Sequence, residues 1–268
     1  MTAPPELSHI RGILFDVDGV LRVGGTPVPT AAETLARLAR RGVPFRLLTN
    51  STVSSRATLA MMLQAQGFPV SEAMVLTAAA ATAAYVAGRF PGAACYLLSK
   101  GDAIDDFRAA GVHIVGPDGA PEAEVVIIGG AEEELTYARL NHAYRLLLRG
   151  ARLVAMHRNV AWRTEEGMTL DSGPFINALA SAAGVRTMVV GKPAAAFFRQ
   201  AMRDIGLLAG ELAMVGDDAR NDLAPARRLG MTGILVRTGK PVGRAEVVLA
   251  DLVFDSVADL DAALTGGA

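Results

Sequence analysis

The sequence predicts an α/β protein built on a doubly wound, mostly parallel sheet. Two features lead to this prediction. Short apolar runs with the length of buried strands alternate with segments of helical spacing along nearly the whole chain. Several of these runs also stop abruptly at polar residues, as strands of parallel sheets do where they border a ligand crevice. The 268 residues suffice for one large domain or two smaller ones.

The first third of the chain alternates twice between strand and helix. Residues 12–17 (GILFDV) and 43–50 (VPFRLLTN) are short and mainly apolar, which favours strands. The segments 30–42 and 55–67 have helical spacing, and each ends on a glycine. Residues 73–88 form the longest apolar run. They are rich in alanine and shorter than the roughly 20 residues that span a bilayer, so an ordinary helix is expected.

The middle and final thirds of the chain continue this alternation. The expected strands are 94–99, 124–130, 151–156, 212–218 and 232–239, and the expected helices are 102–110, 135–149, 194–206 and 223–230. A further short strand is expected within residues 187–193 (TMVVGKP). Neither a repeat nor a low-complexity linker interrupts the pattern, which is typical of parallel sheets covered by helices.

The composition is that of a soluble globular protein, because 51% of the residues are apolar and 20% are charged. The net charge of −1 indicates no basic surface for nucleic acid, and no membrane partner is expected. The single cysteine, Cys95, lies in an apolar run and is expected to be a buried thiol. The N-terminal segment lacks a basic head followed by an apolar stretch, so the expected location is cytoplasmic.

Four strand ends carry polar residues that together suit phosphate chemistry. They are ILFDVDGVL (13–21) with Asp16 and Asp18, LLTNS (47–51) with Thr49 and Asn50, VVGKP (189–193) with Lys192, and VGDDARND (215–222) with Asp217, Asp218 and Asp222. Carboxylates without a neighbouring histidine or cysteine favour a hard cation such as Mg²⁺, and a lysine with hydroxyl and amide groups suits phosphate oxygens. One carboxylate could attack phosphorus while the second acts as general acid and base.

Each of these segments alone has a simpler explanation. Asp-x-Asp-Gly and the acidic segment near residue 217 are also common in turns, and Thr-Asn-Ser is common at helix caps. The prediction of a functional site depends on the four strand ends occurring together and in this order.

The ordered set resembles the motifs of the haloacid dehalogenase superfamily of phosphotransferases, over residues 12 to about 255. The resemblance implies a Rossmann-like core in which Asp16 is the nucleophile and Asp18 the general acid and base. It further implies phosphate binding by Thr49, Asn50 and Lys192, a Mg²⁺ ion held by Asp16, Asp18 and Asp217, and supporting roles for Asp218 and Asp222. The implied reaction is hydrolysis of a small phosphorylated substrate, which is a phosphate monoester, pyrophosphate or a phosphoramidate, through an aspartyl-phosphate.

The spacing of the motifs adds a second domain to this expectation. Between Thr49 and Lys192 the chain runs for 143 residues, enough for an inserted domain. In this superfamily such an insertion implies an α/β cap of the C2 type, which places the core at 1–79 and 187–268 and the cap at 80–186. Residues 156–184 resemble the NagD-like branch, specifically the subgroup of phospholysine phosphohistidine inorganic pyrophosphate phosphatase.

Other functions and details stay open at this level. A non-catalytic phosphate-binding or regulatory protein on the same scaffold is the main alternative, although Asp16 and Asp18 are both present. A carbon–halogen hydrolase is a minor alternative, since it does not need the second acid at position 18. In the inserted segment the polar candidates for substrate contact are His157, Arg158, Arg163 and Asp171, each with a structural role as the simpler explanation. The substrate and the oligomeric state, including a homodimer, are not determined by the sequence.

Overall fold

The computed structural model describes residues 7–116, 122–164 and 167–264. The chain divides into two compact units. The first unit contains the described residues up to Thr49, then Leu59–Leu76, and the chain from Lys192 on, whereas the second contains Asn50–Thr58 and Thr77–Gly191. Within the described residues, none of the helices is long and apolar enough to cross a lipid bilayer.

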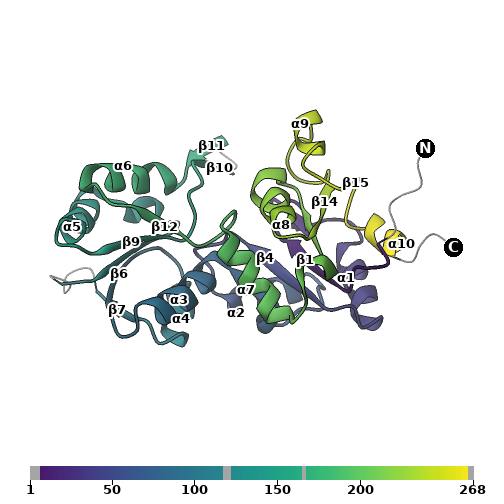
Figure 1. The fold of residues 1–268 in the computed structure, drawn as a ribbon, viewed down its shortest axis with the longest axis horizontal. Helices are drawn as coiled ribbons and strands as arrows, with labels where there is room; N and C mark the ends of the chain where they lie inside the picture. Colours follow the sequence, from purple (N-terminus) through teal and green to yellow (C-terminus); the bar gives the residue numbers. More distant parts are fainter. Residues whose placement is uncertain (1–6, 117–121, 165–166, 265–268) are drawn as a thin grey trace. The chain divides into compact units, whose positions relative to one another are not determined.

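The first unit is built on a six-stranded sheet with the order β15-β14-β13-β1-β4-β5 (Figure 1). These strands are β1 (Gly12–Asp16), β4 (Phe45–Thr49), β5 (Val75–Thr77), β13 (Leu212–Gly216), β14 (Thr232–Val236) and β15 (Leu252–Phe254). The ladders from β4 through β1, β13 and β14 to β15 are all parallel. The carboxyl ends of the central strands therefore lie along one edge of the sheet.

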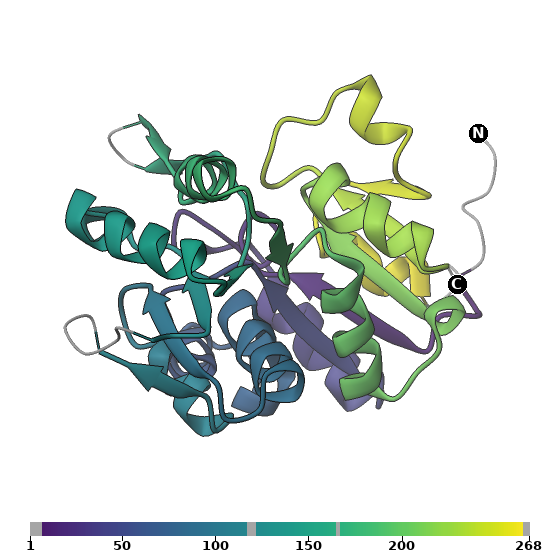
Figure 2. The same ribbon diagram turned by 60° about the vertical axis from the view of Figure 1, so that its left-hand side comes forward.

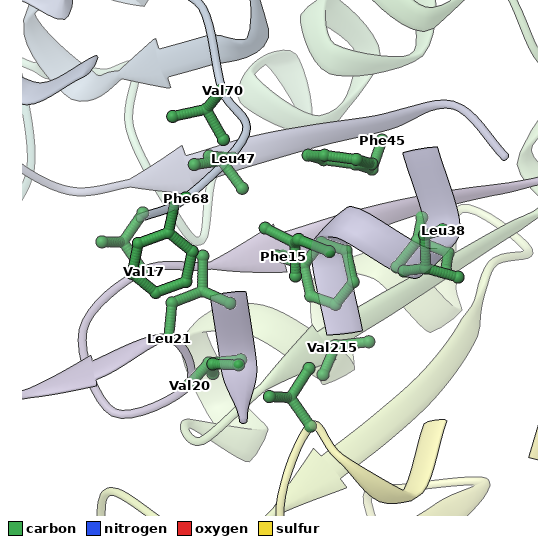
Figure 3. Packing of buried hydrophobic residues seen from close by; sticks show 14 of the residues in the cluster. Phe15, Val17, Val20, Leu21, Leu38, Phe45, Leu47, Phe68, Val70 and Val215 are labelled. Carbon is green, nitrogen blue, oxygen red and sulfur yellow. The ribbon is translucent and has the colours of Figure 1, made fainter. Parts of the chain in front are cut away.

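Strand β1 lies at the centre of this unit because both of its faces are apolar. Every residue from Gly12 to Asp16 is buried. Ile13 and Phe15 point into a large core cluster, whereas the intervening Leu14 faces the other side of the sheet, as the two-residue period of a strand requires. Figure 3 shows Phe15 packed among Val17, Leu38, Phe45 and other members of this cluster.

Helices cover both faces of the sheet. The core cluster joins β1 to α1 (Ala31–Arg40), α2 (Arg56–Ala65) and α10 (Asp259–Leu264). In both ribbon views, α7 (Ala195–Ile205) and α8 (Ala224–Arg228) lie on the opposite face (Figures 1 and 2). Helix α1 has the amphipathic pattern of a helix that covers a sheet, because Leu35 and Leu38, three residues apart, are completely buried and Arg40 is exposed.

Shorter elements complete the first unit. They are the hairpin strands β2 (Arg22–Val23) and β3 (Thr26–Pro27), the 3₁₀ turns η1 (Glu72–Met74) and η3 (Ala209–Glu211), the π-helical turn η4 (Ala219–Leu223) and the helix α9 (Arg244–Val247). The β2–β3 hairpin follows β1 directly, and η4 follows β13. Both therefore extend the edge at which the strands end.

The second unit has its own parallel sheet with the order β12-β9-β8-β6-β7. These strands are β6 (Ala94–Leu98), β7 (His113–Val115), β8 (Val125–Ile128), β9 (Arg152–Ala155) and β12 (Thr187–Val189). In both ribbon views α5 (Tyr137–Leu148) and α6 (Gly173–Ala183) lie on one face, and α3 (Ala78–Arg89) and α4 (Ile104–Ala109) on the other. The 3₁₀ turn η2 (Glu132–Glu134) and an antiparallel hairpin of β10 (Ala161–Thr164) and β11 (Gly167–Leu170) complete the unit.

The predicted α/β class with doubly wound parallel sheets is confirmed, and most of the expected strands and helices occur within a few residues of their predicted bounds. The helix expected over residues 73–88 is wrong in its first part, because Val75–Thr77 form the edge strand β5 beside β4 and α3 begins only at Ala78. Cys95 lies buried in β6, as expected.

The observed division differs from the expected one in three segments. Residues 77–79 and 187–191 belong to the second unit and not to the first, and strand β12 within 187–191 pairs with β9 of that unit. Asn50–Thr58 also belongs to the second unit. The contacts explain this: Gly130 N–H donates to Thr52 Oγ1 at 2.7 Å, and Ser55 donates to Asp102 from both its backbone and its hydroxyl.

Candidate active site

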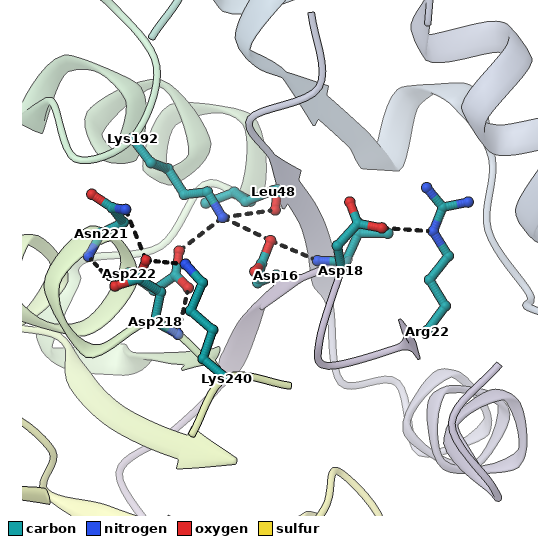
Figure 4. Close-up of polar contacts among 10 residues, drawn as sticks. Asp16, Asp18, Arg22, Leu48, Lys192, Asp218, Asn221, Asp222 and Lys240 are labelled. Atoms are coloured by element: carbon teal, nitrogen blue, oxygen red, sulfur yellow. Dashed lines mark hydrogen bonds and ion pairs between the residues drawn. The ribbon is translucent and has the colours of Figure 1, made fainter. Parts of the chain in front are cut away.

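The edge at which β1, β4, β13 and β14 end gathers several of the polar residues predicted from the sequence, and Figure 4 labels Asp16, Lys192, Asp218 and Asp222 among them. Asp16 is the last residue of β1, Thr49 is the last residue of β4, and Asp217 directly follows β13. Adjacent parallel strands end at the same edge, which is the physical reason why residues 200 positions apart become neighbours here.

Lys192 is buried in the middle of this group, with only 4% of its side chain exposed. Its Nζ atom lies 2.7 Å from Oδ1 of Asp16 and 2.8 Å from Oδ1 of Asp222. It also donates to the carbonyl oxygen of Leu48, at 3.4 Å. Burial alone would lower the pKa of Lys192, but the charges of Asp16 and Asp222 outweigh it and raise the pKa, so the ammonium form persists.

Three buried carboxylates form the acidic part of the site. One oxygen each of Asp16, Asp217 and Asp222 lies within 4.8 Å of the others. Burial raises the pKa of Asp16 well above its usual range despite the opposing charge of Lys192. Burial, reinforced by Asp222, raises the pKa of Asp217 to about 6. The site thus holds more negative charge than its surroundings stabilise.

Asp16, Asp217 and Asp222 are suited to bind a metal ion, both because of this excess of negative charge and because they offer carboxylate oxygens as ligands. Carboxylate oxygens are the ligands that Mg²⁺ prefers, and the pKa values of Asp16 and Asp217 are raised in the direction that a nearby divalent cation would reverse. The arrangement therefore suits a hard divalent cation next to the ammonium of Lys192.

Asp218 has a structural position beside the cluster. It caps the π-helical turn η4 by accepting hydrogen bonds from the backbone N–H groups of Arg220 and Asn221, both at 3.0 Å. The side-chain amide of Asn221 donates to it at 2.8 Å, and Lys240 forms an ion pair with it. Burial opposes ionisation, but these donors prevail and lower the pKa of Asp218. The turn that Asp218 caps carries Asp222 back to the cluster.

The structure does not bring the carboxylate of Asp18 into this group. The side chain of Asp18 is 63% exposed and accepts a hydrogen bond from Nε of Arg22 at 2.9 Å. The cause is the tight turn after β1, in which the N–H of Gly19 donates to the carbonyl of Arg22 and the chain reverses into the β2–β3 hairpin. Within the described residues, the group of acids able to share a metal contains Asp222 in the place expected for Asp18.

Comparison with known proteins decides the family. A haloacid dehalogenase-like hydrolase model matches residues 13–113, and a HAD-hydrolase-like model matches residues 189–260. The chain is 36% identical to haloacid dehalogenase-like hydrolase domain-containing protein 2 of Rattus norvegicus, over 86% of this chain and 85% of the relative. The chain belongs to the haloacid dehalogenase-like hydrolases. The human phospholysine phosphohistidine inorganic pyrophosphate phosphatase is 35% identical, over 88% of this chain and 86% of that protein.

Solved structures of this hydrolase family are similar along almost the full length. The 4-nitrophenylphosphatase of Thermotoga maritima has a TM-score of 0.87 at 26% identity, covering 96% of this chain and 98% of that one. NagD of E. coli has a TM-score of 0.83 at 27% identity, covering 93% and 98%. The predicted relationship to the haloacid dehalogenase family and its NagD-like branch is confirmed, and the phosphatase names of these relatives agree with the predicted enzyme class.

In this hydrolase the two predicted phosphate-binding residues of the second motif fall on a unit boundary. Thr49 is buried at the end of β4 in the first unit, and Asn50 is the first residue of the second unit. The backbone thus passes from one unit to the other directly at the motif. It crosses between the units again after Thr58 and after Leu76, and it returns to the first unit for the last time between Gly191 and Lys192, directly at the third motif.

The polar candidates of the inserted segment lie in the second unit. His157 is buried, and its Nε2 atom lies 3.7 Å from Oδ1 of Asp171. Burial lowers the pKa of His157, and the charge of Asp171 opposes this only in part, which favours a neutral imidazole. Arg158 donates to the side chain of Asn177. For Arg163, the structure describes the backbone in β10 and its side chain lies outside the description.

Several residues around the site were not predicted from the sequence. They are Gly19, Arg22, Asn221, Thr238, Gly239 and Lys240. The last three follow β14 after Arg237, so the rule that located Asp217 after β13 also applies to them. The roles of Arg22 and Asn221 depend on local turns and had no comparable signal in the sequence.

Proposed function

We propose that this haloacid dehalogenase-like hydrolase is a magnesium-dependent phosphatase that acts on a small phosphorylated substrate through an aspartyl-phosphate. The observation that carries the proposal is the placement of Lys192 against Asp16 at the edge where the acids gather. A buried ammonium beside a buried carboxylate provides a place for phosphate oxygens next to a nucleophile.

In the first step, a carboxylate oxygen of Asp16 attacks phosphorus, and the bond between phosphorus and the leaving-group oxygen or nitrogen breaks. The general acid, predicted to be Asp18, donates a proton to the leaving group. In the second step, a water molecule attacks the phosphorus of the aspartyl-phosphate, and the ionised Asp18 takes its proton. Inorganic phosphate leaves and the Asp16 carboxylate is regenerated. For this role the Asp18 side chain has to rotate away from Arg22.

Lys192 keeps its charge through both steps, since its raised pKa excludes deprotonation near neutral pH. Its ammonium is placed to hold a phosphate oxygen while it remains in contact with Asp16. Asp16 and Asp217 would hold Mg²⁺ together with Asp222, and Asp18 is a predicted further ligand. When bound, Mg²⁺ neutralises charge on the phosphate oxygens and on these carboxylates.

The second unit is proposed to select the substrate as a cap of the C2 type. The support is the position of two crossings between the units: the first crossing follows Thr49 and the last precedes Lys192, so both lie at predicted phosphate-binding residues. Arg158 and Asp171 are the residues proposed to select the substrate. We further propose that the protein is cytoplasmic and binds neither nucleic acid nor a membrane.

A panel of phosphorylated compounds tests this function. The names of the relatives suggest 4-nitrophenyl phosphate, inorganic pyrophosphate, phospholysine and phosphohistidine as members of the panel. We expect Mg²⁺-dependent release of phosphate from at least one of them, and none from a folded Asp16→Asn variant. Binding of inorganic phosphate without turnover of any member would instead support the non-catalytic alternative.

A further inference from the structure

The loop of residues 238–240, which follows β14, makes close contacts with two of the motif segments. We propose that this loop is a positioning element that aims the carboxylate of Asp217 at the metal and fixes the turn at Gly19. This inference rests on the proposed function and extends it to residues outside the four motifs. The loop lies wholly in the first unit.

The backbone of the loop closes over the Asp217 carboxylate. The N–H of Lys240 donates to Oδ2 of Asp217 at 3.0 Å. A Cβ atom placed on Gly239 would lie 2.0 Å from the same oxygen and 2.7 Å from Cα of Gly19. These distances are too short for any side chain, so glycine at position 239 lets the backbone approach Asp217 closely.

The backbone of Gly19 also closely approaches the Asp217 carboxylate. Its φ of 88° lies in the left-handed region, and a Cβ there would lie 2.2 Å from Oδ2 of Asp217. The carboxylate is therefore held between two glycine backbones and the N–H group of Lys240. Its orientation depends on both loops being in place.

Two side chains of the loop tie it to the neighbouring motifs. The hydroxyl of Thr238 donates to the carbonyl oxygen of Gly19, which belongs to the turn that follows Asp16 and Asp18. The ammonium of Lys240 pairs with Asp218, the cap of the turn that carries Asp222. The 238–240 loop thus connects the first motif to the fourth, although more than 200 residues separate them in the chain.

This arrangement matters for metal binding because Mg²⁺ requires nearly ideal octahedral geometry. Groups that orient a ligand typically change metal affinity by about 10- to 100-fold when they are removed. Thr238→Val is the most informative variant, since it removes only the hydroxyl and leaves the charge of the site unchanged. Gly239→Ala is the stronger variant, because its methyl group must displace the Asp217 carboxylate.

The experiment is titration of each metal-free protein with Mg²⁺ alone, followed by calorimetry, without substrate. We expect the dissociation constant to rise about tenfold or more for Gly239→Ala and several-fold for Thr238→Val. Thr232→Val at the opposite end of β14 and Gly210→Ala, where a methyl group meets open space, are the matched controls and should stay within twofold of wild type.

The outcomes separate this inference from the function on which it rests. A wild-type protein that binds no Mg²⁺ would refute both. Wild-type binding with an unchanged constant in folded Thr238→Val and Gly239→Ala would refute the positioning role alone. If Gly239→Ala fails to fold, Thr238→Val decides. Thermal unfolding in EDTA, compared with that of the controls, shows whether a loss of affinity reflects a general loss of stability.

Discussion

The Nζ atom of Lys192 lies 2.7 Å from Oδ1 of Asp16, although 176 residues separate the two in the chain. Both side chains are buried, and Lys192 simultaneously pairs with Asp222. One ammonium therefore holds together two strand-end segments, and the same charge is available to a phosphate group beside Asp16.

Asp16→Asn tests the nucleophile directly. An amide cannot form the acyl-phosphate, so we expect turnover to fall by about 10³-fold or more. The comparison variant is Asp251→Asn, which alters a partly exposed carboxylate paired with Arg227 and should keep full activity. Phosphate release by a correctly folded Asp16→Asn protein at the wild-type rate would refute the mechanism.

Lys192→Met should destabilise the metal-free protein. The substitution leaves two buried carboxylates without their cation, which typically costs about 3–5 kcal/mol of unfolding free energy. Urea denaturation in EDTA measures it. Lys100→Met, which breaks the partly exposed pair with Glu132, is the matched control and should cost less than about 1 kcal/mol. Equal losses in the two variants would contradict a special role for the buried ammonium.

Removal of the metal ion should abolish the phosphatase activity. EDTA is expected to abolish phosphate release, and added Mg²⁺ should restore it. Asp217→Asn should raise the Mg²⁺ concentration for half activity by at least about tenfold, because it removes a charged oxygen ligand. An unchanged metal titration would exclude Asp217 from the ligand set, and activity that survives chelation would argue against the metal.

The pKa of Asp217 predicts a pH dependence of stability in EDTA. The folded protein holds this proton up to about pH 6, whereas an ordinary aspartate loses it near 3.8. Between these values the folded state binds more protons than the unfolded state, so the unfolding free energy should fall as pH rises. Asp217→Asn removes this loss and should be more stable than wild type at pH 7.5, by about 2–3 kcal/mol, with the difference vanishing near pH 4. Denaturation at both pH values checks this, and a difference of constant size would contradict it.

Asp102 should be important for the stability of the second unit. Its carboxylate accepts hydrogen bonds from the backbone and hydroxyl of Ser55, both at 2.9 Å, and from the hydroxyl of Thr58. Asp102→Ala removes all three and should lower the unfolding free energy by about 1–3 kcal/mol. Asp105→Ala, which breaks only an exposed pair with Arg108, is the control. Faster hydrogen exchange should appear in residues 50–58 of Asp102→Ala alone.

Much of the fold was predictable because it follows from local patterns. The strand at 12–17 is apolar on both faces, the helix at 30–42 has a buried stripe of 3.6-residue period, and both signals are independent of distant residues. The main site residues were also predictable, since parallel strands end at a common edge. Asp16 and Asp217 meet there for that reason. Lys192 does not follow a strand of this sheet, because the preceding strand β12 belongs to the sheet of the second unit.

Other features depend on contacts between distant segments, which no local pattern encodes. The direction of the Asp18 side chain follows from the turn at Gly19 and the pairing with Arg22. The carboxylate of Asp18 therefore lies outside the buried acidic cluster, which contains Asp222 instead. Residues 50–58 belong to the second unit because Asp102 and Gly130 bind them from 47 and 78 positions away. The closure of the 238–240 loop over Asp217 likewise requires that β14 lie beside β13. Strand order and the direction of a side chain after a turn are set by packing of the whole unit, whereas strand ends and helix faces are set by neighbouring residues.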